Sequence, residues 1–183
     1  MKCQRLMSII RGERPAALIL KNGKVVNVFS GEVYSADVVV DSGKIVALGP
    51  GIKGEEEVDL EGRIVCPGFF DAHVHIESSM VTIPEFARTV VPRGTTTVVI
   101  DPHEIANVMG LDGIRYMLQS SKYQPLNVYV MIPSCVPATH LETSGSELRA
   151  VDLFPYVGQE WILGLGEMMN FPGVLFCDQE VVD

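Results

Sequence analysis

Two histidines one residue apart, His73 and His75, lie at the end of a short apolar run that begins at Phe69. Alternate side chains of a β-strand point to the same side, so both imidazoles should face one centre, with Asp71 one step deeper on that side. Neutral imidazole is a good ligand for zinc, iron and other first-row metals. The spacing therefore predicts two metal ligands on one rigid strand. The alternative is an ordinary pair of histidines on a half-buried strand.

Three polar residues, Glu77, Ser78 and Ser79, follow this pair almost directly. Side chains placed next to metal ligands often orient them through hydrogen bonds. We therefore predict that these three residues, and Asp71 as a further candidate, orient the histidines or contact a substrate. The alternative for the three is that they cap the helix that follows, and for Asp71 it is a structural role.

Further polar side chains follow later apolar runs. Asp101, His103 and Glu104 come directly after the run that ends at Ile100, and Glu167 comes after the last such run. A lone carboxylate is costly to bury, which favours either a partner for Glu167 or an exposed strand end. His103 and Glu104 are candidates for contact with a metal or substrate, although Asp-Pro at the start of this segment is also typical of a turn.

The elements that must position these residues alternate between strands and helices. Strands are expected to begin at four places roughly 30 residues apart, the spacing of βα units: near Phe69, Thr95, Asn127 and Trp161. Thr82 is a candidate N-cap for the first helix, and a second helix is expected over 111–121. Polar residues after four successive strands favour an α/β fold of the (β/α)8 TIM-barrel type, of which about four units are present, over an open doubly wound sheet.

The first part of the chain has a different sequence pattern. Short β runs between 17 and 65 are joined by turn residues, and Asn22-Gly23 between two apolar runs predicts a β-hairpin. Asp41-Ser42-Gly43 predicts a second tight turn. We therefore expect a small antiparallel β domain over 1–66 and the first half of the barrel over 67–183.

The bulk composition excludes several classes of protein. The 183 residues are 47% hydrophobic and 20% charged, which is typical of a globular chain. A net charge of −9 argues against nucleic-acid binding, which depends on neutralising phosphates. No apolar run approaches the roughly 20 residues of a membrane span. The four scattered cysteines are expected to be reduced, and the expected location is the cytoplasm.

Three longer strings, 75–80, 101–110 and 164–170, together with the histidine pair, resemble the amidohydrolase superfamily, and within it the adenine deaminases. The resemblance extends over almost the whole chain and includes the β runs near the N-terminus. It implies a small β-sandwich joined to a metal-bearing (β/α)8 barrel. It also implies hydrolysis of adenine, the small-molecule substrate, to hypoxanthine and ammonia by metal-activated hydroxide, as part of purine metabolism.

The resemblance also assigns site residues. His73 and His75 match the metal ligands of strand one, and Glu167 matches a carboxylate that bridges two metals in adenine deaminases. Related hydantoinases commonly have a carboxylated lysine at that position. The implied cofactor is a binuclear centre of Mn²⁺ or Fe²⁺, with Zn²⁺ as an alternative. Glu167, His103 and Glu104 are the catalytic candidates.

The superfamily adds histidines from strands five and six and an aspartate from strand eight, and no histidine follows Glu167 here. The chain is therefore expected to hold part of the centre and to be completed by a missing C-terminal half or by a homo-oligomer. It would then be a fragment, one half of a split enzyme, or a degenerate product. Two other functions remain open: a non-catalytic metal-binding or assembly module, and a hydantoinase-like hydrolase of cyclic amides.

Overall fold

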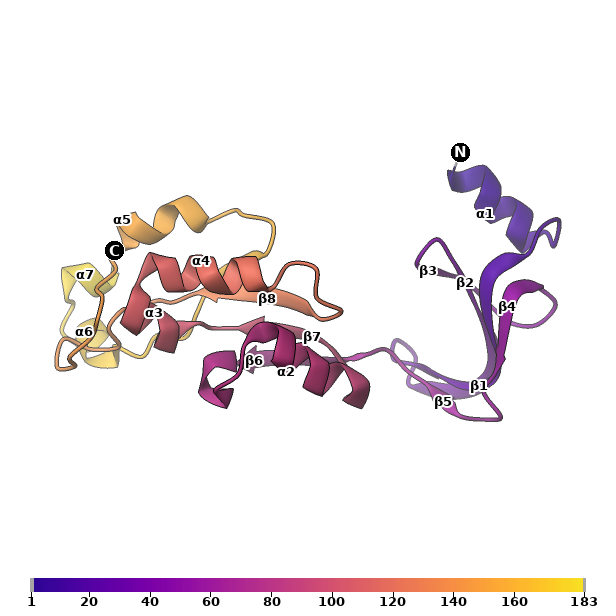
Figure 1. The fold of residues 1–183 in the computed structure, drawn as a ribbon, viewed down its shortest axis with the longest axis horizontal. Coiled ribbons are helices and arrows are strands. Elements are labelled where there is room, and N and C mark those ends of the chain that lie inside the picture. The colour runs from indigo at the N-terminus through magenta and orange to yellow at the C-terminus, as the bar shows by residue number, and fades with distance from the viewer. Residues whose placement is uncertain (1, 183) are drawn as a thin grey trace. The chain divides into compact units, whose positions relative to one another are not determined.

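The computed structural model describes residues 2–182, and the chain divides into two compact units, residues 1–67 and 68–183. The first unit holds one helix and one five-stranded sheet (Figure 1). Its elements are α1 (Lys2–Ile10), β1 (Ala16–Asn27), β2 (Glu32–Asp41), β3 (Lys44–Leu48), β4 (Gly54–Asp59) and β5 (Ile64–Val65). Four strands lie in the order β3-β2-β1-β4, and β5 also pairs with β1.

The predicted hairpin at Asn22-Gly23 is wrong. β1 runs continuously through both residues and pairs with β2, with a register shift between Leu20↔Val38 and Gly23↔Ala36. Asn22 has a φ of 56°, so the Asn-Gly pair forms a bulge that places one extra residue in β1. A bulge and a hairpin turn both use a left-handed residue, and for this reason the local sequence did not distinguish them.

The turn at Ser42-Gly43 is confirmed, since Asp41 pairs with Lys44 across a two-residue hairpin with positive φ at both central residues. The purely antiparallel arrangement is wrong, because β4 and β5 both run parallel to β1. The five strands of the first unit form a single sheet, and the small core of this unit contains Ile9 of α1 against Ile19 and Val39.

Helix α1 is tied to the sheet through one buried carboxylate. Arg5 donates two hydrogen bonds to Asp41, of 2.9 Å from Nε and 2.7 Å from a terminal nitrogen. The Ala17 N–H (3.2 Å) and the Ser42 hydroxyl (2.9 Å) also donate to this carboxylate. The hydrogen bonds from Arg5, together with those from Ser42 and Ala17, outweigh burial and hold the pKa of Asp41 well below its ordinary value.

We expect Asp41→Asn to lower the melting temperature of the first unit. Because folding lowers the pKa of Asp41, its ionised form contributes stability that is fully present above the unfolded pKa of about 3.9 and is lost as the pH falls through the folded value. The difference in melting temperature between wild type and variant should therefore be constant near neutral pH and shrink below about pH 4.

Far-UV circular dichroism would follow both units. Fluorescence of Trp161, the only tryptophan of the sequence, reports on the second unit alone. Glu13→Gln removes an exposed carboxylate paired with Arg11 and serves as the matched control. Equal losses in Asp41→Asn and Glu13→Gln would contradict the role assigned to the buried ion pair.

The second unit is built on a parallel sheet, in which β6, β7 and β8 are labelled in Figure 1. Its strand order is β6-β7-β8-β9. Its strands are β6 (Phe69–Val74), β7 (Thr95–Ile100), β8 (Asn127–Ile132) and β9 (Ile162–Leu165). Its helices are α2 (Ile83–Val90), α3 (His103–Met109), α4 (Leu111–Ser120), α5 (Ala150–Leu153), α6 (Phe171–Leu175) and α7 (Gln179–Val182), with 3₁₀ turns at Ile76–Ser79, Val91–Arg93 and Phe154–Tyr156. The predicted start points of all four strands are confirmed to within one residue.

Helices α2 and α4 cover one face of this sheet, where Ala87 and Met117 pack against Val98, Val128 and Val130. The predicted start of α2 is confirmed, because Thr82 is the N-cap residue in extended conformation, although its hydroxyl makes no capping hydrogen bond. None of the helices described between residues 2 and 182 is long and apolar enough to cross a membrane.

The opposite face of the sheet is uncovered at its edge. Leu163 and Leu165 alternate along β9 with Ile162, which packs against the helix-covered core. The two leucine side chains are 54% and 60% exposed. Glu167 follows two residues later, so the face that carries the exposed leucines leads directly to the candidate ligand.

Candidate metal centre

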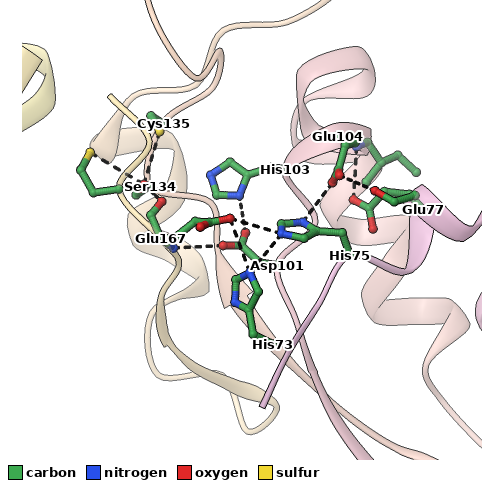
Figure 2. Close-up of polar contacts among 12 residues, drawn as sticks. His73, His75, Glu77, Asp101, His103, Glu104, Ser134, Cys135 and Glu167 are labelled. Atoms are coloured by element: carbon green, nitrogen blue, oxygen red, sulfur yellow. Dashed lines mark hydrogen bonds and ion pairs between the residues drawn. The ribbon is translucent and has the colours of Figure 1, made fainter. Parts of the chain in front are cut away.

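His73, His75 and Glu167 meet at the carboxyl end of the parallel sheet (Figure 2). The two Nε2 atoms lie 3.0 Å apart. Oε1 of Glu167 lies 3.4 Å from Nε2 of His73 and 3.2 Å from Nε2 of His75. The strand alternation predicted that both imidazoles would face one centre, and the structure places them so.

The candidate ligand atoms come from the two edges of the sheet. β6 ends at Val74, between the two histidines, and β9 ends at Leu165, two residues before Glu167. Three strand spacings of about 4.8 Å separate these edge strands in a flat sheet. The side chains at the ends of β6 and β9 nonetheless converge, as they do where a parallel sheet curls toward a barrel.

The three residues fit a metal ion in donor type and in spacing. Ligand atoms about 2.0–2.1 Å from a tetrahedral ion lie about 3.3 Å from each other. The separations of 3.0, 3.2 and 3.4 Å among the Nε2 and Oε1 atoms are close to that value. Two imidazoles and a carboxylate suit zinc, iron or manganese. The cluster therefore has the geometry of a three-ligand site, and the metal role of its members stays a prediction.

Glu104 contacts Nδ1 of His75, the ring nitrogen that faces away from the candidate metal position. Its Oε2 lies 3.1 Å from Nδ1 of His75, and its Oε1 accepts a 2.6 Å hydrogen bond from the Ser78 hydroxyl. A carboxylate on Nδ1 keeps the proton there and leaves the Nε2 lone pair for a metal. The structure thus places Glu104 behind a candidate ligand, with Ser78 holding Glu104 in turn.

These contacts shift three pKa values. Burial favours neutral His75, but the charges of Glu104, Asp101 and Glu167 outweigh it and raise the pKa of His75. Burial also opposes ionisation of Glu104, yet the Ser78 hydrogen bond and the facing His75 hold the pKa of Glu104 below its ordinary value. Burial, reinforced by the charge of Glu104, raises the pKa of Glu77.

Two neighbouring serines offer a matched test of this arrangement. The Ser78 hydroxyl bonds Glu104, whereas the Ser79 hydroxyl bonds only the carbonyl of Ile76 in its own turn. Loss of a partner that orients a ligand typically weakens metal binding about 10–100-fold. We therefore expect Ser78→Ala to weaken Mn²⁺ binding by roughly tenfold. Ser79→Ala should leave it unchanged in an equilibrium titration, and equal effects of the two variants would argue against a role for the Glu104 contact.

The remaining predicted residues lie around the cluster. Asp71 is exposed on β6, and its carboxylate accepts the backbone N–H of His73 at 3.2 Å, which is a structural contact. Oε1 of Glu77 accepts the N–H of Ile105 at 3.4 Å, and its buried Oε2 has no hydrogen-bond partner in the described part of the chain. Ser79 caps its own turn, whereas the side chains of Ser78 and Glu77 both interact with Glu104, the residue behind His75.

His103 is buried beside Asp101. The two side chains are 2% and 0% exposed, and Nδ1 of His103 lies 2.6 Å from Oδ1 of Asp101. These two atoms are close but not aligned for a hydrogen bond. Neither of them, nor Nε2 of His103, has a hydrogen-bond partner among the described residues. The predicted catalytic role of His103 stays a prediction.

Two residues of the site were not predicted from the sequence as functional. Oδ2 of Asp101 accepts the backbone N–H of Glu167 at 3.0 Å, and the Ser134 hydroxyl donates to the carbonyl of Glu167. Both follow the ends of buried strands, which is the one signal that the sequence carries for them.

The family model of the amidohydrolase family matches residues 64–170, more than half of the chain. The chain therefore belongs to the amidohydrolase family. The matched segment contains the ligand cluster and the buried Asp101–His103 pair.

Relatives at about half sequence identity are adenine deaminases. That of Desulfatibacillum aliphaticivorans is 52% identical over 178 residues, which cover 97% of this chain and 31% of the relative. That of Clostridium acetobutylicum is 54% identical over 94% of this chain and 30% of its own length. That of Archaeoglobus fulgidus is 46% identical over 100% of this chain and 33% of its own length. The predicted resemblance is confirmed, and the chain spans about a third of the length of these relatives.

Two solved structures are similar to this chain in fold. N-acyl-D-glutamate deacylase from Bordetella bronchiseptica, complexed with zinc and a phosphonate inhibitor, matches with a TM-score of 0.51 and 20% identity over 65% of this chain and 30% of that chain. Atrazine chlorohydrolase TrzN from Arthrobacter aurescens, complexed with zinc, matches with a TM-score of 0.52 and 17% identity. The match covers 88% of this chain and 43% of that chain.

Proposed function

We propose that this chain carries the first ligands of a metal-dependent enzyme that hydrolyses adenine to hypoxanthine and ammonia. The observation that carries the proposal is the convergence of His73, His75 and Glu167 on one point. The choice of adenine is supported by the adenine deaminases that are about half identical to almost the whole chain. A carboxylate at position 167, where hydantoinase-like enzymes commonly have a carboxylated lysine, also favours deamination.

The architecture that we propose is a (β/α)8 barrel with a small β-sandwich domain. The four parallel strands would form its first half, and the sheet of the first unit would form one layer of the sandwich. Two observations support a larger assembly: the relatives are about three times as long as this chain, and Leu163 and Leu165 are exposed on the sheet face that leads to Glu167. Further ligands would come from the missing strands.

The chain's own residues have distinct tasks in this proposal. His73 and His75 would hold the metal through Nε2, and Glu167 would hold it through its carboxylate. Glu104 keeps the proton of His75 on Nδ1. A divalent metal, for which we propose Mn²⁺ or Fe²⁺, would supply activation of water at neutral pH. Departure of ammonia requires a proton donor near the purine amine, and Glu104, whose lowered pKa keeps it ionised beside His75, does not suit that step.

The experiment that tests the proposal compares this chain alone with a chimera. In the chimera, the chain replaces the matching third of the Desulfatibacillum aliphaticivorans relative, which restores the remaining strands. With Mn²⁺ or Fe²⁺, the chimera should form hypoxanthine and ammonia in equal amounts from adenine, and the chain alone should not. A folded, metal-loaded chimera without adenine turnover would overturn the proposal. Turnover of cyclic amides in its place would favour a hydantoinase-like hydrolase.

A further inference from the structure

The side chain of Asp101 lies beneath the ligand cluster and reaches the main chain of another strand. It is fully buried at the end of β7, and its Oδ2 accepts the N–H of Glu167 at 3.0 Å (Figure 2). The backbone N–H of Asp101 donates to the carbonyl of Val74 at 3.2 Å, between the two histidines. Asp101 thereby connects the strand end that carries the histidines to the one that carries the carboxylate.

The neighbouring Gly166 permits this contact. A Cβ atom added to Gly166 would overlap with Oδ2 of Asp101 and lie 2.7 Å from its Cγ. Gly166 does not have a positive φ, so its backbone conformation would accept alanine. The requirement for glycine therefore arises from the close approach of the Asp101 carboxylate.

The main chain of Glu167 is held on both sides of its Cα atom. Asp101 accepts its N–H, and the Ser134 hydroxyl donates to its carbonyl. With both peptide groups fixed, only the side-chain torsions of Glu167 remain free. This restricts the positions from which its carboxylate can meet His73 and His75.

A metal-ligand role for Asp101 is the competing interpretation, because Asp101, His103 and Glu167 also offer ligand atoms within 4.8 Å of one another. However, Oδ1 of Asp101 and Nδ1 of His103 are only 2.6 Å apart, whereas two ligands of a tetrahedral ion lie about 3.3 Å apart. Asp101 already uses its Oδ2 on a backbone N–H. The geometry favours positioning over ligation.

We infer that Asp101 is a positioning residue that fixes the peptide of Glu167 and so directs its carboxylate to the metal. This inference rests on the proposed function only in naming the metal as the target. The positioning of the Glu167 main chain is a property of the chain itself and is measurable without metal.

The test uses three variants of the 183-residue chain and one control. Asp101→Asn keeps an oxygen that can accept the Glu167 N–H but is a poor metal ligand, and Asp101→Ala loses both properties. Gly166→Ala keeps every candidate ligand but displaces the Asp101 carboxylate. Asp112→Asn removes an exposed carboxylate paired with Arg115 and is the matched control.

Mn²⁺ affinity is the first readout. We expect Asp101→Ala and Gly166→Ala to bind Mn²⁺ about 10–100-fold more weakly than wild type, and Asp101→Asn and the control to bind close to wild type. Melting temperatures would show that each variant is folded. Equal losses in Asp101→Asn and Asp101→Ala would identify Asp101 as a ligand, and no loss in any variant would remove its role; either result overturns the inference.

Hydrogen exchange of the Glu167 amide is the second readout, and it requires no metal. The amide should be protected in wild type and Asp101→Asn and should exchange faster in Asp101→Ala and Gly166→Ala. If the wild-type chain bound no Mn²⁺, the proposed function would lose its support, but hydrogen exchange would still test the positioning role of Asp101. Unchanged exchange of the Glu167 amide in Asp101→Ala would overturn that role.

Discussion

Replacement of both His73 and His75 by alanine is expected to abolish Mn²⁺ binding by this chain and adenine turnover by the chimera. The double variant removes two of the three ligand atoms that lie within 3.4 Å of one another. Because changes to residues that only orient a ligand cost about 10–100-fold in affinity, loss of two ligands should cost more than about 100-fold. Equilibrium titration with Mn²⁺ would measure this directly.

His140 provides the control for this variant. It is an exposed histidine in the loop between β8 and α5, outside the candidate ligand clusters of the described residues. His140→Ala should bind Mn²⁺ as tightly as wild type. If the double variant retained wild-type affinity, or if His140→Ala lost as much, the metal would bind elsewhere and the assignment of the ligands would be wrong.

The second large effect concerns the uncovered sheet face. Leu163→Ala and Leu165→Ala should change the stability of this chain little, because both side chains are more than half exposed. In a complete barrel the same side chains would be buried in its interior, where Leu→Ala typically costs about 2–5 kcal/mol. We therefore expect each substitution to be nearly neutral in the chain alone and strongly destabilising in the chimera.

Chemical denaturation of both proteins, followed by Trp161 fluorescence, would measure the difference. Met117→Ala is the control, because Met117 is buried between α4 and the sheet already in this chain. It should be destabilising in both contexts. Similar, small effects of the leucine substitutions in the chimera would mean that further strands do not cover this face, against the proposed barrel.

The sequence predicted the second unit well because its signals are local. Thr96 to Ile100 and Val128 to Ile132 are nearly continuous apolar or β-branched runs, as buried parallel strands require, and both form strands. The convergence of His73 and His75 followed from strand alternation alone. The two-residue hairpin at Ser42-Gly43 was equally local.

Other features depended on contacts between distant residues. Asn22-Gly23 forms a bulge because β1 continues along β2 and β4, and the local sequence contains no sign of that pairing. Helix α3 was not predicted. Its seven residues are too few for a clear helical periodicity, and it ends at Met109, with Gly110 alone between it and the start of α4.

The same reason explains what was missed in the site. The contact between Asp101 and the Glu167 amide joins residues 66 positions apart, and the Ser134 contact joins residues 33 positions apart. Residue types after strand ends indicated that polar groups would gather there. They did not indicate which carboxylate would face a metal and which would hold the main chain, because that distinction depends on the fold around each side chain.

The most direct test of the central claim is an anomalous difference map from crystals of this chain soaked with zinc, for which ligand distances are well defined. We predict a peak about 2.0–2.2 Å from Nε2 of His73, Nε2 of His75 and a carboxylate oxygen of Glu167. A peak at the buried Asp101–His103 pair, or a saturating zinc concentration that leaves the three-ligand cluster without a peak, would contradict the account.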